Sequence, residues 1–294
     1  MTTIGFLGLG RMGAPMAANL IGQADGVVVH DIYPPAVGAL VAQGAQAAGS
    51  TAALGQRCEL VFISLPTPGI VREAVGELIA GGAPRIICDL STSGPRLAQE
   101  LHDLLAPLGV ASFDAPVSGG IARAREGSLS LMVGGPAALY PEIEPLLARL
   151  GTPIHMGETP GAGQTMKLVN NLLGTVAIGV TAEGMAFGIK AGLDPARMIE
   201  VLNQSTGINS ATRDKWPKSV LPRRFDFGFA AALSLKDTKL LMEEAAAMGV
   251  PLPLGEVVRR HLERVLATYG EEADFTEIAK VVEADAGLDP ERPA

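Results

Sequence analysis

A single lysine stands in an otherwise apolar stretch in the second half of the chain. Residues 161–171 read Gly-Ala-Gly-Gln-Thr-Met-Lys-Leu-Val-Asn-Asn, so Lys167 and Asn171 are four residues apart. On a helix, this spacing places both side chains on one face. A buried lysine is costly unless it is paired or its pKa falls, and a lowered pKa suits a group that transfers protons. The residues alone leave two interpretations open: Lys167 exchanges a proton with a substrate, or its amine extends to solvent.

A second candidate follows an apolar, strand-like segment at residues 111–114. The sequence Asp-Ala-Pro-Val-Ser-Gly-Gly at 114–120 places the hydroxyl of Ser118 beside Gly119 and Gly120. No side chain covers the N–H groups of these glycines, so the loop can hold a carboxylate. The same residues also suit a plain glycine-rich turn, and both interpretations stay open.

The N-terminal residues carry the pattern of a dinucleotide-binding turn. An apolar run leads into G-x-G-x-x-G, and a helix is expected to follow. In this pattern the first glycine allows a tight turn, the second lets the backbone approach the phosphates, and the third lets helix and strand pack closely. The helix N-terminus then offers N–H groups to the pyrophosphate. The predicted cofactor contacts are Gly8, Leu9, Gly10, Arg11, Met12 and Gly13.

An acidic residue supports this interpretation and favours one cofactor. A second apolar run, residues 27–30, ends at Asp31, about 20 residues after the glycines, where a carboxylate accepts hydrogen bonds from the adenosine ribose. Asp31 would repel a 2′-phosphate, and residues 32–56 contain no Arg or Lys to attract one. We therefore expect NAD rather than NADP.

The segments that must position these residues change in type along the chain. Up to about residue 155, strand-like and helix-like segments alternate, which is typical of a doubly wound parallel sheet with helices on both faces. The predicted strands are 3–8, 27–31, 60–65, 85–90, 111–114 and 129–133, and the predicted helices lie near 12–22, 35–43, 69–80, 94–107 and 136–150.

After Gly161 the strand pattern ends and helical periodicity takes over. The predicted helices are 164–190, 194–204, 235–248, 252–269 and 274–284, with a less regular segment at 205–234 and a frayed tail at 285–294. The prediction is therefore an α/β protein with a Rossmann-type NAD-binding domain, 1–162, followed by an all-α substrate and oligomerisation domain, 163–294.

Composition narrows the possible partners. The chain of 294 residues has a net charge of −8 and no basic stripe, which argues against nucleic acid and anionic membrane surfaces as partners. The four histidines are scattered without zinc-ligand spacing, so we expect no metal site. Cys58 and Cys88 lie in apolar segments and are expected to be buried free thiols. No charged leader precedes the first strand, and the apolar stretch near 172–192 is interrupted by charges, so a cytoplasmic protein is expected.

Four motifs in this order resemble the β-hydroxyacid dehydrogenases, the family of 3-hydroxyisobutyrate dehydrogenase and tartronate semialdehyde reductase. They are residues 5–16, 114–120, 161–171 and Leu235-Lys236-Asp237, and the likeness covers nearly the whole chain. The combination is far more specific than any one motif.

The resemblance implies a role for each site residue. Lys167 would be the general acid/base, Asn171 would orient the substrate or the lysine, and Ser118, Gly119 and Gly120 would hold the substrate carboxylate. Lys236 would lie near the nicotinamide. Leu65, Pro66 and Thr92 would line the cofactor, although residues 64–68 and 89–95 taken alone also suit turns with helix caps. The family is usually oligomeric, which implies a homodimer or homotetramer.

The implied activity is NAD-dependent hydride transfer at C3 of a short 3-hydroxy acid resembling 3-hydroxyisobutyrate. Arg123 stands where members of this family often have a small residue, and it is expected either to face solvent or to meet a second anionic or polar group of the substrate. Arg223 and Arg224 add further charge, so a more polar substrate stays open, such as tartronate semialdehyde, threonate or a sulfolactaldehyde. A non-catalytic NAD-binding relative and an imine reductase are the competing interpretations. The intact Lys167 argues against both, and 6-phosphogluconate dehydrogenase itself has a longer helical domain.

Overall fold

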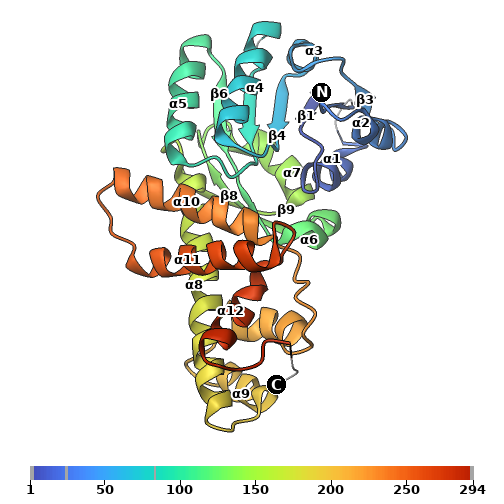
Figure 1. Cartoon of the computed structure of the whole chain (residues 1–294). Helices are drawn as coiled ribbons and strands as arrows, with labels where there is room; N and C mark the ends of the chain where they lie inside the picture. Colours follow the sequence, from blue (N-terminus) through green and yellow to red (C-terminus); the bar gives the residue numbers. More distant parts are fainter. Residues whose placement is uncertain (1–2, 24–25, 83, 292–294) are drawn as a thin grey trace. The chain divides into compact units, whose positions relative to one another are not determined.

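The computed structural model describes residues 3–23, 26–82 and 84–291. The chain divides into two compact units, Met1–Lys167 and Leu168–Ala294, which we call the first and second units (Figure 1). The first unit is a mostly parallel sheet with helices and the second is helical, so the predicted fold class is confirmed. The predicted division of function at residues 162 and 163 falls inside helix α8 (Ala162–Lys190) and stays a prediction.

The sheet of the first unit has the strand order of a dinucleotide-binding fold. Its order is β3-β2-β1-β4-β5-β6-β8-β7, with β9 paired to β8. The strands are β1 (Ile4–Leu7), β2 (Val27–His30), β3 (Gln46–Ala47), β4 (Leu60–Ile63), β5 (Ile86–Asp89), β6 (Ala111–Asp114), β7 (Val117–Ser118), β8 (Leu129–Gly134) and β9 (Gly151–Gly157). From β3 to β6 all pairs are parallel, so the carboxyl ends of these strands meet at one edge, where such sheets bind their ligands.

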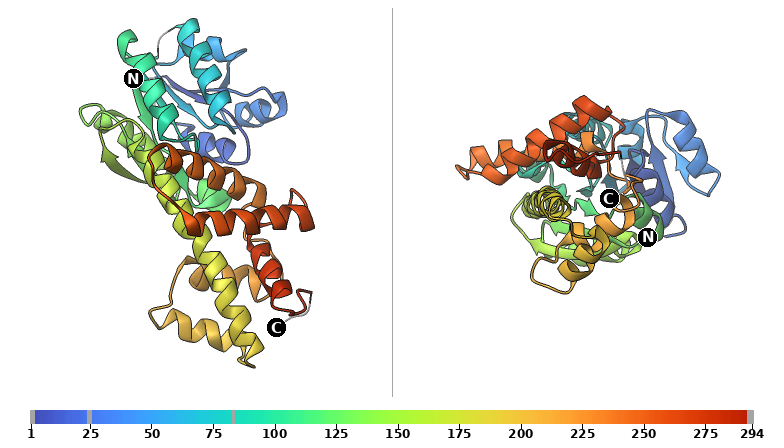
Figure 2. Two further views of the ribbon diagram at one scale, coloured as in Figure 1. Left: turned by 60° about the vertical axis from the view of Figure 1, so that its left-hand side comes forward. Right: turned by 60° about the horizontal axis from the view of Figure 1, so that its bottom comes forward.

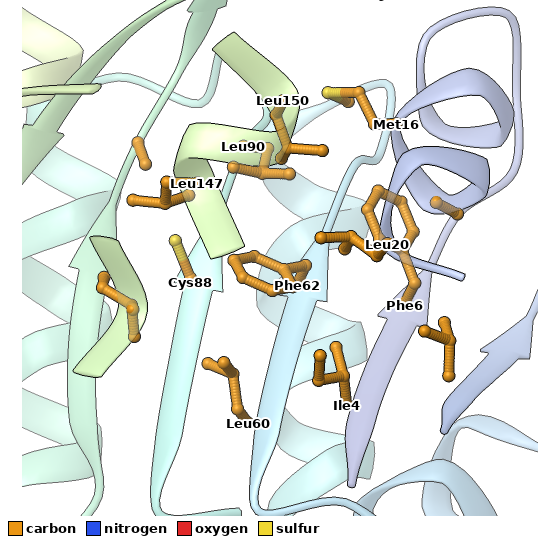
Figure 3. Close-up of a cluster of buried hydrophobic side chains, with 14 of the residues drawn as sticks. Ile4, Phe6, Met16, Leu20, Leu60, Phe62, Cys88, Leu90, Leu147 and Leu150 are labelled. Carbon is orange, nitrogen blue, oxygen red and sulfur yellow. The ribbon is translucent and has the colours of Figure 1, made fainter. Parts of the chain in front are cut away.

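Helices cover both faces of this sheet, which explains the continuous apolar runs of its strands. On one face, Phe6, Phe62 and Cys88 point toward α1 (Gly13–Leu20) and α7 (Tyr140–Leu150), as Figure 3 shows. On the other face, Leu7 and its neighbours pack with side chains from three further helices. These are α3 (Thr51–Arg57), α4 (Pro68–Gly81) and α5 (Pro95–Leu105), and α2 (Pro34–Val41) lies beside β3.

Several short elements were not predicted from the sequence: β3, β7, β9, α3 and α6 (Gly120–Glu126). Each of β3 and β7 has two residues, which is too few to show a period, and only the paired neighbour defines them. Along β9, exposed residues alternate with half-buried ones and Pro153 interrupts the run. Proline is tolerated there because β9 pairs with β8 alone among the described strands.

The second unit consists of helices around their own apolar core. They are α8, α9 (Pro195–Asn203), a π-helix (η2, Ala211–Val220), α10 (Ala231–Ala247), α11 (Pro253–Tyr269), the short 3-10 helix η3 (Phe275–Glu277) and α12 (Ile278–Asp285). In Figure 2, α10 and α11 run side by side. The core includes Ile178, Trp216, Leu262 and Phe275. The segment predicted to be irregular contains the π-helix.

The predicted frayed tail, 285–294, is wrong for the residues that the structure describes. Arg223 donates to both carboxylate oxygens of Glu283, at 2.7 and 2.8 Å, and to the carbonyl of Pro290. Lys280 lies 3.4 Å from the carboxylate of Glu291. Residues 286–291 are therefore fastened to the second unit, and 292–294 lie outside the described residues.

The two cysteines are free and buried, as predicted. Burial raises the pKa of Cys58 to about 11 and that of Cys88 well above its usual range, so both thiols stay protonated at neutral pH.

Within the described residues, no group of three or more His, Cys, Asp or Glu side chains is placed to hold a metal ion. Among the described helices, α8 is long and apolar enough to cross a membrane by length and composition alone, and 44% of its apolar window is buried inside the protein.

Candidate active site

The glycine turn after β1 has the geometry that a dinucleotide requires. Gly8 has a φ of +92°, and a Cβ there would overlap the carbonyl oxygen of Ser64. A Cβ on Gly13 would overlap the carbonyl oxygen of Gly8, which brings α1 against the turn. Around Gly10 no atom lies within 4 Å of a Cβ position, and Gly10 is exposed. The turn therefore presents open backbone to an incoming phosphate, and no side chain caps the N-terminus of α1.

Asp31 joins this turn to the end of β2. Its carboxylate oxygens accept from the N–H of Leu9, at 2.6 Å, and from the N–H of Tyr33, at 2.8 Å. Each oxygen keeps a further lone pair, so the carboxylate can also accept hydrogen bonds from ribose hydroxyls. The structure thus places Asp31 beside the residues with which it was predicted to act.

Two further loops meet the glycine turn at the same edge of the sheet. The N–H of Leu65 donates to Oγ of Ser91 at 2.9 Å, so the loops after β4 and β5 are bonded to one another. A Cβ on Gly8 would come within 2.9 Å of Leu65. Pro66 is exposed and Thr92 is half-buried on these loops. Leu65 therefore lies against Gly8, and the loop that carries Thr92 is bonded to the loop that carries Leu65 and Pro66.

The loop predicted to bind a carboxylate lies between β7 and α6. Ser118 ends β7, and the next two residues, Gly119 and Gly120, have φ values of +140° and +74°. Both glycines are exposed. Only glycine adopts two such conformations readily, and the turn leaves the backbone N–H groups uncovered. The stem of Arg123 lies against Gly119, which puts a cation next to this loop.

Lys167 lies near the start of α8, five residues after the helix begins, and is only 8% exposed. The side chain as a whole is therefore buried, as the interpretation of Lys167 as a proton-transfer group requires. Asp114, at the end of β6, accepts from the N–H of Gly161 at 2.9 Å and of Gln164 at 2.7 Å. A residue of the sheet therefore satisfies the first N–H groups of the helix that carries the lysine.

The second unit holds the remaining predicted residues in one cluster. Asn171 donates to a carboxylate oxygen of Asp237 at 2.8 Å, and the amine of Lys236 lies 3.2 Å from the other oxygen. Asp237 is buried, so its carboxylate is balanced by an amide and an ammonium. The predicted residues Asn171 and Lys236 are thus oriented by one carboxylate, whose role the sequence did not reveal.

Two arginines that depart from the family pattern are engaged elsewhere. Arg223 is paired with Glu283, and Arg224 lies 3.1 Å from the carboxylate of Asp226. Both interactions lie within the second unit. Arg123, by contrast, is exposed on α6.

Comparisons with known proteins agree on one family. Residues 3–157 match the NAD-binding domain of 6-phosphogluconate dehydrogenase, and residues 161–282 match the NAD-binding domain of NADP-dependent 3-hydroxyisobutyrate dehydrogenase. A 3-hydroxyisobutyrate dehydrogenase of Pseudomonas aeruginosa is 38% identical over 294 residues, covering 96% of this chain and 98% of the relative. A 2-(hydroxymethyl)glutarate dehydrogenase of Eubacterium barkeri is 37% identical over 290 residues, covering 97% and 96%.

The solved structures agree with the sequence relatives. The 3-hydroxyisobutyrate dehydrogenase of Mycobacterium tuberculosis, solved with L-serine, superimposes with a TM-score of 0.90 at 33% identity, over 96% of this chain and 99% of that one. These relatives are named as hydroxyacid dehydrogenases, both matching family models describe NAD-binding domains, and the glycine turn fits such a cofactor.

The two glycines of the turn predict opposite variant behaviour. Gly10→Ala meets no atom in the protein, so its free energy of unfolding should stay within about 0.5 kcal/mol of the parent. Its methyl group would stand where the phosphates approach, and we expect NAD to bind at least about tenfold more weakly. Calorimetric titration and denaturant unfolding measure the two effects.

The matched control is Gly13→Ala. Its Cβ would overlap the carbonyl of Gly8, so this variant should lose about 1–3 kcal/mol of stability. Gly10→Ala protein that binds NAD as tightly as the parent would contradict the assignment of this turn.

The position of Asp31 leads to a prediction about the preference for NAD over NADP. Asp31→Ala removes the carboxylate that would accept from the ribose and repel a 2′-phosphate, so kcat/KM for NAD should fall by about tenfold or more. The ratio of kcat/KM for NAD to that for NADP should move toward NADP. Asp103→Ala, an exposed carboxylate on α5, is the control. A ratio that matches the parent's would show that Asp31 does not set the preference.

Proposed function

Because the chain belongs to the β-hydroxyacid dehydrogenase family, we propose that it transfers hydride between NAD and C3 of a short 3-hydroxy carboxylic acid, with Lys167 as the general acid/base. The observation that carries the proposal is the burial of Lys167 on α8, within the same unit as a complete dinucleotide turn. A lysine held out of water at this place is the proton-transfer group that alcohol oxidation needs.

The proposed reaction assigns one task to each group. Bound NAD supplies the hydride acceptor. Lys167, in its neutral form, takes the proton of the C3 hydroxyl as the carbonyl forms, and in the reverse direction its ammonium form returns that proton to the alkoxide oxygen. Ser118 and the N–H groups of Gly119 and Gly120 hold the substrate carboxylate, which fixes C3 in position. Asn171 orients the substrate or the lysine, and Lys236 contacts the nicotinamide end of the cofactor.

A more polar substrate is the second candidate. Arg123 lies against the loop that would hold the carboxylate, so it is placed to meet a second anionic group. A relative named for 2-(hydroxymethyl)glutarate, a dicarboxylate, supports this possibility. Polar semialdehydes, sugar acids and sulfonated acids are further substrates that carry a second polar or anionic group. Screening NADH formation with 3-hydroxyisobutyrate, L-serine, threonate, 2-(hydroxymethyl)glutarate and a sulfonate analogue separates the two candidates by kcat/KM.

We also propose that the chain works in the cytoplasm as a homodimer or homotetramer. Exposed apolar residues repeat along α8 at spacings of four and seven, so they form a stripe on one side of the helix: Val169, Leu173, Val180 and Phe187, which are 42, 66, 58 and 79% exposed. Exposed apolar side chains aligned on one side of a helix are typical of an association surface.

Removing this apolar stripe tests the association. Leu173→Glu and Phe187→Glu together should convert the oligomer to monomer in analytical ultracentrifugation, because two charges would be buried unpaired. Glu200→Gln, at an exposed position on α9, is the control. A parent protein that sediments as a monomer at micromolar concentration would refute the proposal.

Lys167 provides the test of the proposed reaction. Lys167→Ala should lower kcat by about 10²–10⁴-fold, because no other group takes up the proton, while NAD still binds within about threefold of the parent affinity. Steady-state assays and titration with NAD measure these separately. Lys239→Ala, which changes an exposed lysine of α10, should match the parent. Turnover by Lys167→Ala at the parent rate would exclude Lys167 as the general acid/base.

A further inference from the structure

The side chain of Gln164 is fully buried three residues before Lys167, and its amide bonds to another loop. Its Oε1 accepts from the N–H of Ser93 at 3.0 Å and of Gly94 at 3.1 Å. Its Nε2 donates to the carbonyl of Ser91 at 2.8 Å. One amide therefore makes three hydrogen bonds to residues 91–94, the loop that follows β5 and carries Thr92.

This loop is also fixed from its other side. Asp89 accepts from Oγ of Ser93 at 2.6 Å and from the N–H of Ser91 at 2.9 Å. Oγ of Ser91 in turn accepts from the N–H of Leu65. With Ser91, Ser93 and Gly94 all buried, Thr92 is the residue of this turn that stays partly accessible. Hydrogen bonds with Asp89, Gln164 and Leu65 therefore hold this loop in place next to the predicted cofactor contacts.

The start of α8 packs closely against backbone atoms of the sheet and of α5. A Cβ on Gly163 would overlap the carbonyl of Met132 and come within 2.6 Å of the carbonyl of Asp114. A Cβ on Gly161 would lie 2.8 Å from Cα of Pro95. Asp114 holds the N–H groups of Gly161 and Gln164 at the same time. The first turn of α8 is thus fastened to β6 by Asp114 and to the loop after β5 by Gln164.

We propose that Gln164 is a positioning residue for the proposed reaction: its amide sets the place of Lys167 relative to the loop that carries Thr92. The inference rests on the proposed function for its catalytic consequence. Lys167 follows one turn after Gln164, a rise of about 4.5 Å along the helix. Gln164, Lys167 and the loop residues that Gln164 contacts all belong to the first unit. Reaction rates depend steeply on such placement, since a shift of about 1 Å can cost about 100-fold.

The chemistry of the amide predicts a distinctive variant. In Gln164→Glu, an ionised carboxylate still accepts from Ser93 and Gly94 but repels the carbonyl oxygen of Ser91. A protonated carboxyl presents both an acceptor and an O–H donor and restores all three bonds. The titratable groups nearest by the described contacts are Asp89, which accepts from Ser93, and Asp114, which accepts from the N–H of Gln164. Cys88 on β5 interacts electrostatically with both carboxylates, and Lys167 follows three residues later on α8. The two buried carboxylates favour the protonated form of the introduced group.

The experiment compares Gln164→Glu and Gln164→Met with the parent. Gln164→Met keeps the length of the side chain but makes none of the three bonds, and we expect kcat to fall at least about tenfold while the affinity for NAD changes less than about threefold. For Gln164→Glu, the ratio of its kcat to that of the parent should rise as the pH is lowered from about 8.5 to about 6. Gln99→Met, which changes an exposed glutamine of α5, is the matched control.

A measurement that does not depend on catalysis, the rate of chemical labelling of Lys167, tests this inference separately from the proposed function. Reductive methylation, followed by mass spectrometry, should modify Lys167 several-fold faster in Gln164→Met than in the parent. Lys215, also 8% exposed but in the second unit, should keep its slow rate, which reports that the fold is intact.

An inactive parent would refute the proposed function, and the labelling rate would still decide whether Gln164 fixes the lysine. Gln164→Met protein with the parent's kcat and the parent's labelling rate at Lys167 would overturn the inference. A rise in labelling at Lys167 and Lys215 together would also overturn it, because Gln164 would then act on global stability alone.

Discussion

The first N–H groups of α8 are buried, and the rest of the site depends on how they are satisfied. A buried amide without a partner costs free energy comparable to a lost hydrogen bond. Asp114 meets this need from the end of β6 by accepting from Gly161 and Gln164. Burial raises the pKa of this carboxyl to about 6, whereas the two N–H groups oppose that rise. Asp114 is therefore ionised at neutral pH, and its charge lies where the positive end of the helix dipole can offset the desolvation. The sheet thereby sets where the helix of Lys167 begins.

The parts of the fold that the sequence predicted are those with a local physical cause. The strands β1, β2, β4 and β5 are apolar runs because helices cover both of their faces, and the glycine turn is required by φ at Gly8 and by the contact between Gly13 and Gly8. Elements defined by a distant partner could not be found this way. The two residues of β7 are a strand only because they pair with β8, and the tail after α12 is held by Arg223, more than 60 residues earlier in the sequence.

The same distinction explains what was found and missed in the candidate site. Lys167 and Asn171 could be predicted because a charge and an amide stand at helical spacing in an apolar stretch, and Asp31 because it ends a strand at the expected distance from Gly10. Their roles stay predictions. Gln164 and Asp237 stand within two of the motifs that carry the family resemblance, but no spacing or apolar surrounding singled them out as site residues. Their partners lie 66 to 73 residues away in the sequence, and a glutamine or aspartate within a helical pattern is ordinarily a solvated residue. Their burial, which only the fold reveals, is what makes these amide and carboxylate groups informative.

In the proposed site, backbone groups would bind the cofactor phosphates and the substrate carboxylate, and a side chain would distinguish between substrates. The phosphate end of the cofactor would meet the glycine turn. This turn tolerates little change, because a methyl group on Gly8 or Gly13 would collide with backbone atoms. Around Gly119 and Gly120 the backbone is equally constrained by positive φ, but the neighbouring Arg123 projects from an exposed helix face and touches the loop only with its stem. Replacing that side chain leaves the backbone cradle intact. Substrate choice in the proposed site can therefore vary at Arg123 without change to the loop proposed to hold the carboxylate, and the relatives are indeed named for different hydroxyacids.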